Sequence, residues 1–221
     1  EEKITVNGNV DLYAVVFNRT TETDLTEDQL PQVDIYKYKQ VIFVGDSRTE
    51  FMENVLTGMG ESATKNVKFV CSAGKGLDWF TTTGWAQLYS IVQHDSNSIL
   101  SKKTAVIFNF GVNDLSKSAD YAEYYNWIAP QLKSKGCELY FMSVNPVNRL
   151  MLPNAGRSDR SEAAVRSFNQ YMKANLSSAY TYIDMYSYLK STGYSFASDH
   201  YGTGTVDDGL HYTTRTYKRI F

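Results

Sequence analysis

The sequence predicts an α/β fold with a parallel sheet, and two features of the chain support this. Short runs of continuous apolar residues recur from residue 41 onward, as expected of strands that are covered on both faces. Between these runs lie segments in which apolar residues recur with helical spacing. Strands that alternate with helices of this length are typical of a parallel sheet flanked by helices.

The N-terminal part of the chain has a different pattern. Residues 1–17 predict a β-hairpin, because an Asn7-Gly8 turn separates two segments of alternating apolar residues. An isolated hairpin is only marginally stable, so this one is either an edge of the main domain or part of a separate module. Residues 18–38 are rich in Thr, Asp and Glu, contain Pro31 and predict a linker or an extended arm.

The remaining residues, 39–221, predict one α/β domain. We expect its strands at 41–44, 67–71, 105–110, 139–144 and 180–185. We expect its helices at 48–59, 85–100, 119–135 and 160–176, with a short last helix from Thr213 or Thr214. In such a sheet, ligands bind at the carboxyl ends of the strands, so the residues that follow each strand are the candidates for chemistry.

Composition and charge exclude several classes of function. The 221 residues include 22 Lys and Arg and 24 Asp and Glu, a formal charge of −2, so there is no general electrostatic reason to expect nucleic acid or an anionic membrane as a partner. No apolar run approaches the roughly 20 residues of a transmembrane helix, so we expect no membrane insertion. The two cysteines, Cys71 and Cys137, fall at opposite ends of their predicted strands and are expected to be unlinked thiols.

Four short motifs follow predicted strands or lie in the last loop. Each has an ordinary structural interpretation alone: Ser47 could cap a helix within a capping box at 47–50, and the other motifs read as turns. Together they supply a hydroxyl, a backbone N–H at a glycine, a side-chain amide and an Asp–His pair, which are the groups that acyl transfer requires. The motifs are residues 45–48, 72–76, 111–114 and 207–213.

In this order, the motifs resemble the sequence blocks of the SGNH hydrolase superfamily, also called the GDSL esterase/lipase family. The four residues for which the superfamily is named correspond to Ser47, Gly74, Asn113 and His211. Arg48 departs from the leucine of the usual signature, and only Gly74 corresponds in the second block. The Gly-x-Ser-x-Gly elbow of α/β-hydrolases is absent around Ser47. The resemblance implies a three-layer α/β/α sandwich with a five-stranded parallel sheet, the flavodoxin-like SGNH fold, in strand order 2-1-3-4-5.

The resemblance also implies the roles of the site residues. Ser47 would be the nucleophile, His211 the general base and acid, and Asp208 the acid that orients the histidine. Asp184, at the end of the fifth predicted strand, is an alternative third member of this triad. The oxyanion hole would consist of the backbone N–H groups of Ser47 and Gly74 and the side-chain amide of Asn113. This chemistry needs no cofactor, and the sequence offers no His–carboxylate cluster to complete a metal site.

Several further residues are candidates for substrate contact. Arg48 either points outward from the first helical turn or touches substrate, and His200 lies in a loop shortly before the triad histidine. Trp79 follows the glycine loop and either stacks on a sugar or packs in the core, whereas Trp127 is expected in the core. The polar segment 145–160 is a candidate substrate-facing loop.

We therefore expect a serine esterase that removes small acyl groups, in particular acetyl, from a carbohydrate or another small-molecule ester. Two alternatives remain open, an O-acyltransferase that uses the same residues and a non-catalytic surface module. Residues 4–15 resemble the closing strands of a Listeria–Bacteroides repeat, a module of bacterial surface proteins, which implies an extracellular or cell-surface location in a bacterium. The oligomeric state does not follow from the sequence.

Overall fold

The structure is a computed structural model of the chain, and it describes residues 37–95, 103–152, 160–196 and 208–221. The predicted hairpin at 1–17 and the predicted arm up to residue 36 lie outside the described residues. His200 lies outside them as well. The domain boundaries proposed for the N-terminal part of the chain therefore stay predictions.

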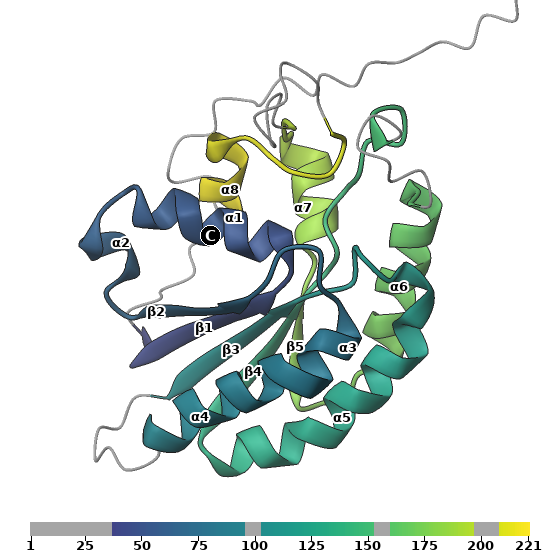
Figure 1. Cartoon of the computed structure of the whole chain (residues 1–221). Coiled ribbons are helices and arrows are strands. Elements are labelled where there is room, and N and C mark those ends of the chain that lie inside the picture. The colour runs from purple at the N-terminus through teal and green to yellow at the C-terminus, as the bar shows by residue number, and fades with distance from the viewer. Residues whose placement is uncertain (1–36, 96–102, 153–159, 197–207) are drawn as a thin grey trace, which may run out of the picture.

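Five parallel strands form the centre of the described part of the chain (Figure 1), as the sequence predicts. Their order across the sheet is β2-β1-β3-β4-β5, the order implied by the family resemblance. Every residue of β1 and β3 is buried, because helices cover both faces of these central strands. The strands are β1 (Gln40–Gly45), β2 (Val67–Cys71), β3 (Thr104–Asn109), β4 (Cys137–Met142) and β5 (Tyr180–Ile183).

Helices on the two faces of the sheet complete the predicted three-layer sandwich (Figure 1). Helices α3 to α6 pack on one face, where Phe80, Phe108 and Phe168 belong to the larger apolar cluster. Helices α1, α7 and α8 pack on the other face, where Met52 and Leu189 belong to a second cluster. The helices are α1 (Ser47–Thr57), α2 (Glu61–Thr64), α3 (Leu77–Trp79), which continues through a π-helical turn (Phe80–Gly84) into α4 (Trp85–Asp95), α5 (Ser118–Ser134), α6 (Glu162–Asn175), α7 (Met185–Thr192) and α8 (Thr214–Ile220).

The sequence patterns do not predict α2, α3 or α7, and two residues explain most of the difference. Glycine disfavours helix, yet Gly84 lies inside a continuous helical segment. A Cβ at Gly84 would lie 2.8 Å from ring atoms of both Trp79 and Phe80, so the glycine allows these rings to pack against the helix. The fifth strand ends at Ile183 rather than at residue 185, because the side chain of Asp184 caps α7.

One aromatic side chain on α5 lies where the sequence does not predict it. Trp127, expected in the core, is 59% exposed and packs against Tyr124, with ring centroids 5.5 Å apart. The prediction is wrong because the buried stripe of α5 runs through Tyr125 and Ile128, which places Trp127 on the outer face of the helix.

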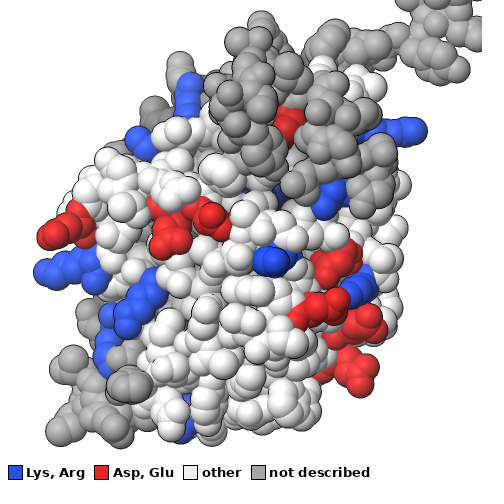
Figure 2. Space-filling view, in the orientation of Figure 1, with Lys and Arg blue, Asp and Glu red and all other residues white. Residues whose placement is uncertain are grey.

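Charged side chains of both signs appear on the face of the molecule that Figure 2 shows, with acidic side chains gathered on its right-hand side and a largely uncharged area at its lower centre. Some opposite charges form surface ion pairs, such as Lys117 with Asp78 at 2.9 Å. Exposed pairs of this kind contribute only about 0–1 kcal/mol. The stability of the fold therefore depends mainly on the two apolar clusters.

The two cysteines are far apart in the sheet. Cys71 ends β2 and Cys137 begins β4, so they lie at opposite edges of the sheet with β1 and β3 between them. Neither cysteine forms a disulfide, as the sequence predicts.

Tyr38 links the first described residues to the sheet. Its side chain is 6% exposed, and its hydroxyl donates a hydrogen bond to Glu138 Oε2 at 2.7 Å. Although the sequence places Tyr38 in the predicted arm, it belongs to the core on the face of the sheet covered by α1. Any shortened chain must therefore keep this residue.

We predict that a chain starting at Lys37 unfolds at the same temperature as the full-length chain. By contrast, Tyr38→Ala in the full-length chain should lower the free energy of unfolding by about 3 kcal/mol, since it leaves a cavity under the sheet. Thermal and urea unfolding followed by circular dichroism measure both effects. Unfolding of the shortened chain would show that residues 1–36 pack on the domain.

Candidate active site

The predicted motifs converge at the carboxyl edge of the sheet. Ser47 opens α1 directly after β1, Gly74 lies in the loop after β2, and Asn113 lies in the loop after β3. Asp208 and His211 lie in the segment that leads into α8, which packs beside α1 (Figure 1). The strands are parallel, so their carboxyl ends share one edge, where α/β proteins bind their ligands.

A series of hydrogen bonds links Ser47, His211 and Asp208. His211 Nε2 lies 2.8 Å from Ser47 Oγ, and His211 Nδ1 lies 2.6 Å from Asp208 Oδ2. Asp208 Oδ1 accepts the backbone N–H groups of Leu210 and His211, both at 2.8 Å. Ser47 and Asp208 are 4% exposed and His211 is fully buried. The imidazole thus contacts a hydroxyl with one nitrogen and a carboxylate with the other.

The surroundings of Asp208 keep its carboxyl group ionised. Burial alone would raise the pKa of Asp208, but hydrogen bonds from the His211 ring and from the backbone N–H groups of His211 and Leu210 outweigh burial and lower this pKa to about 2. An anionic carboxylate beside Nδ1 favours the tautomer that carries its proton there. Nε2 is then the hydrogen-bond acceptor that faces the Ser47 hydroxyl.

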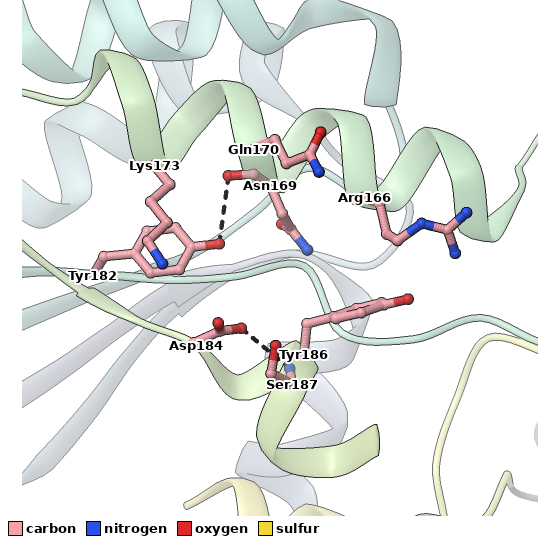
Figure 3. Close-up of a pocket in the computed structure, with 8 residues that line it drawn as sticks. All are labelled: Arg166, Asn169, Gln170, Lys173, Tyr182, Asp184, Tyr186 and Ser187. Atoms are coloured by element: carbon pink, nitrogen blue, oxygen red, sulfur yellow. Dashed lines mark hydrogen bonds between the residues drawn. The ribbon is translucent and has the colours of Figure 1, made fainter. Parts of the chain in front are cut away.

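The alternative acid, Asp184, lies in a different place. Its carboxylate accepts the backbone N–H of Ser187 at 3.1 Å and lines a pocket between α6 and α7 (Figure 3). This pocket encloses about 210 Å³ and is also lined by Arg166, Lys173 and Tyr182. The triad residues do not line it. Of the two candidate acids, Asp208 is therefore the one that contacts the histidine.

The cap of α1 is Asp46 and not Ser47. Asp46 Oδ1 accepts the backbone N–H of Arg48 at 3.0 Å, and Ser47 is the first residue of the helix. The predicted capping box at 47–50 is therefore wrong, because the preceding side chain takes the cap. The Ser47 hydroxyl is left to face His211.

The glycine before this cap has a steric role. A Cβ at Gly45 would lie 1.9 Å from Thr49 Oγ1 and 2.9 Å from the carbonyl oxygen of Asn109. Thr49 belongs to the first turn of α1 and Asn109 ends β3. Only glycine allows the first turn of α1 to approach the sheet this closely, so Gly45 helps to set the depth of Ser47.

The loops that carry Gly74 and Asn113 contact each other. Asn113 Nδ2 donates a hydrogen bond to the carbonyl oxygen of Lys75 at 2.7 Å. An amide nitrogen carries two protons, so this bond accounts for one of them. Gly74 has a φ of +70°, a conformation that favours glycine. The amide and the glycine loop thus lie together beside the end of β1.

Two further residues, Arg160 and Asp114, hold these loops. Arg160 is 8% exposed, and it donates from Nη2 to Asn113 Oδ1 at 2.9 Å and from Nε to the carbonyl oxygen of Val112 at 2.6 Å. Asp114 accepts the backbone N–H of Leu77 at 2.9 Å. Asp114 directly follows Asn113 in its motif, which is a usable signal. Arg160 contacts a residue 47 positions away, so no local pattern indicates its role.

The side chain of Arg48 points inward from the first turn of α1. It is 3% exposed, and its guanidinium group donates hydrogen bonds to three backbone carbonyl oxygens. Of the two orientations that the sequence leaves open, the outward one is wrong, because these three hydrogen bonds hold the guanidinium inside the protein.

The other candidate contacts are placed as follows. Trp79 is half-buried and packs beside Phe110, with ring centroids 6.0 Å apart. The first residues of the segment 145–160 are buried rather than open to substrate, and the N–H of Asn148 donates to the carbonyl oxygen of Gly209 at 2.8 Å. Residues 145–148 therefore pack on the loop that carries the histidine.

The part of the chain that the structure describes contains neither a cluster of metal ligands nor a membrane-spanning helix. There, no group of three or more His, Cys, Asp and Glu side chains could hold a metal ion. No helix in these residues has the length and apolar character needed to cross a bilayer.

Comparison with known families agrees with this geometry. The family model of the GDSL-like lipases/acylhydrolases matches residues 41–221, a range that includes every motif described above. The chain belongs to the GDSL-like lipase/acylhydrolase family. It is thus an enzyme of the GDSL or SGNH ester hydrolase type, and the resemblance seen in its motifs is confirmed. No curated protein matches the chain.

Solved structures share the GDSL/SGNH fold at low sequence identity. An inferred acylhydrolase from Bacteroides fragilis is 17% identical, with a TM-score of 0.53 over 96% of this chain and 94% of that one. A proposed SGNH hydrolase from Slackia heliotrinireducens is 15% identical, with a TM-score of 0.56 over 82% and 94% of the two chains. TesA is 14% identical, with a TM-score of 0.50 over 82% and 93%. At these identities the likeness concerns the fold.

The buried cap residue Asp46 generates a prediction about pH and stability. Burial raises the pKa of Asp46 to about 6. The hydrogen bond from the Arg48 backbone N–H and the positive charge of Arg48 lower this pKa, but burial outweighs them. Because this pKa lies above the unfolded value of 3.8, Asp46 stabilises the fold most at low pH and loses that contribution as the pH rises through 6. Asp46→Asn keeps a capping oxygen but does not titrate.

We therefore expect the wild type to lose free energy of unfolding relative to Asp46→Asn as the pH rises from about 5 to about 8. The difference in free energy of unfolding between the two proteins should change by roughly 1–2 kcal/mol in favour of the variant. Urea unfolding of both proteins at the two pH values measures the difference. A constant difference between them would contradict a raised pKa for this carboxyl group.

Proposed function

We propose that this GDSL-family enzyme is a serine esterase that cleaves small acyl esters, in particular acetyl esters of carbohydrates, through an acyl-enzyme. The observation that carries the proposal is the buried series of contacts from Ser47 through His211 to Asp208, at 2.8 and 2.6 Å. These are the residue types and contacts of a Ser-His-Asp triad.

In the first half of the reaction, Ser47 Oγ would attack the ester carbonyl carbon while its proton passes to His211 Nε2. The tetrahedral intermediate would then collapse by breaking the bond to the leaving alcohol, which takes that proton from His211. Asp208 would stay ionised throughout, because its pKa of about 2 lies far below neutral pH, and would stabilise the imidazolium.

In the second half, a water molecule would attack the acyl group on Ser47 and give one proton to His211. Collapse of this second intermediate would release the carboxylic acid and return the proton to Ser47 Oγ. An alcohol in place of the water would make the same residues an O-acyltransferase. The fate of the acyl-enzyme therefore separates the two activities.

Negative charge on the carbonyl oxygen would be met by the N–H groups of Ser47 and Gly74 and by the amide of Asn113. Two observations support this assignment. Ser47 is the first residue of α1, where backbone N–H groups have no partner within the helix. The Asn113 amide is held by Arg160, so its direction does not have to be set during the reaction.

Two features favour a small acyl group on a sugar. The apolar pocket of about 110 Å³ on the face of the sheet under α7 and α8, which Phe43 and Phe221 help to line, shares no lining residue with the triad and so does not serve as an acyl channel. The half-buried indole of Trp79 follows the Gly74 loop and offers a surface on which a sugar ring could stack.

Ser47→Ala should reduce the hydrolysis of p-nitrophenyl acetate by about 10⁴-fold or more, because it removes the nucleophile. The thermal unfolding temperature should change little, since Asp46 and not Ser47 caps α1. A fluorophosphonate probe, located by mass spectrometry, should label Ser47 in the wild type.

Ser62→Ala, an exposed serine on α2, is the matched control and should retain full activity and labelling. Wild-type rates in Ser47→Ala would overturn the assignment of the nucleophile. Labelling of another residue would overturn the proposed triad.

Activity should fall as the acyl chain lengthens, and acetylated xylan or another acetylated glycan should be hydrolysed faster than a long-chain ester of the same alcohol. Release of free carboxylic acid from p-nitrophenyl esters of graded length and from acetylated glycans measures this preference. Preference for long chains would contradict the small-acyl proposal. Faster transfer of acetyl to an added sugar than to water would favour the acyltransferase.

A further inference from the structure

Arg48 directly follows the proposed nucleophile and is buried at the centre of the site. It is 3% exposed, in the same first turn of α1 as Ser47. A guanidinium group carries a positive charge and five N–H donors, so burying it is costly unless these donors are hydrogen bonded. What these donors contact therefore indicates what the residue does.

The guanidinium joins two separate segments of the chain. Its Nε donates to the carbonyl oxygen of Leu210 at 2.9 Å. Its Nη1 and Nη2 donate to the carbonyl oxygens of Asn145 and Pro146, both at 2.8 Å. The group also lies over the ring of Tyr212, 5.0 Å from the centroid. A planar fork of donors holds three carbonyl groups in fixed directions, whereas the three donors of an ammonium group rotate at the end of a flexible stem.

One of these segments carries the histidine. Leu210 and Tyr212 are the neighbours of His211 in the chain. Arg48 therefore contacts the backbone of the residue before His211 and the aromatic ring of the residue after it. Phe51, one turn further along α1, packs against the imidazole itself, with ring centroids 4.9 Å apart. The helix that begins with Ser47 thereby holds both the loop and the ring of His211.

We propose that Arg48 is the residue that sets the distance between His211 and Ser47, acting as a positioning residue through the Leu210 carbonyl. This inference rests on the proposed triad. It explains why an arginine occupies the site: buried charged groups can often be replaced by apolar residues without loss of stability, so packing alone does not require a guanidinium there. Fixing a loop that has no strand or helix of its own does require donors.

The test compares Arg48→Met and Arg48→Lys with the wild type. Methionine keeps an unbranched stem and removes every donor, whereas lysine keeps the charge and loses the fork. We expect kcat for p-nitrophenyl acetate to fall by about 10²-fold in Arg48→Met, with KM little changed, because the general base is displaced by a fraction of an ångström or more. Arg48→Lys should recover only part of this loss.

Arg219→Met is the matched control. Arg219 also donates to two backbone carbonyls, of Gly193 at 2.7 Å and Thr192 at 3.1 Å, and lies 5.9 Å from the ring centroid of Tyr188. It does so from the last turn of α8, and the two carbonyl groups to which it donates do not belong to the His211 loop. Its replacement should lower the unfolding temperature while kcat stays at the wild-type value.

A spectroscopic readout separates positioning from general loss of stability. In the wild type, the Nδ1 proton of His211, held against Asp208 at 2.6 Å, should give a strongly downfield proton NMR signal. This signal should shift or broaden in both Arg48 variants and stay unchanged in Arg219→Met. If Arg48→Met does not fold, the kcat and the NMR signal of Arg48→Lys test the inference instead.

Wild-type kcat together with an unchanged signal in a folded Arg48 variant would overturn the inference, even where Ser47→Ala is inactive. Full activity of Ser47→Ala would instead overturn the proposed triad on which the inference rests. Equal losses of kcat in Arg48→Met and Arg219→Met would also overturn the inference about Arg48, since such losses would reflect reduced stability alone.

Discussion

Burial of polar groups is the constraint on which the arrangement of this site depends. The triad side chains, Ser47, Asp208 and His211, are at most 4% exposed. A buried polar group without a hydrogen-bond partner destabilises the fold by about 1–3 kcal/mol, which is a large part of the stability of a typical domain. Each therefore has a hydrogen-bond partner, and the partners extend outward to backbone groups such as the Leu210 N–H. The geometry that suits acyl transfer is the same geometry that satisfies these groups.

The first turn of α1 meets this constraint through neighbouring residues with different tasks. Gly45 makes room for the turn against β3, and Asp46 supplies the cap. Because Asp46 caps the helix, the Ser47 hydroxyl faces the imidazole. The buried Arg48 side chain links the same turn to two loops through its hydrogen bonds. A change at any of these positions alters the surroundings of the serine without touching the serine itself.

Much of the fold follows from the sequence because its signals are local. Buried parallel strands appear as continuous apolar runs, and the residues after them lie at one edge of the sheet whatever the details of the helices. Ser47, Asn113 and His211 could be placed at one site in this way. By contrast, the orientation of Arg48 and the role of Arg160 depend on carbonyl groups far away in the chain, which no periodicity encodes. Trp127 was misplaced because an aromatic residue on a helix does not by itself reveal which stripe faces the core.

Arginines recur where segments without regular structure must be held. Arg48 holds the loop before His211, Arg160 holds the loop that carries Asn113, and Arg219 holds the end of α7. In each case the guanidinium donates to backbone carbonyl oxygens, which loops and the last turn of a helix leave without a partner in regular structure. The sheet determines where its strand ends lie, but it cannot fix a loop that leaves it. At this edge of the molecule, the position of the general base and of the oxyanion amide therefore depends on side chains that reach across from neighbouring elements.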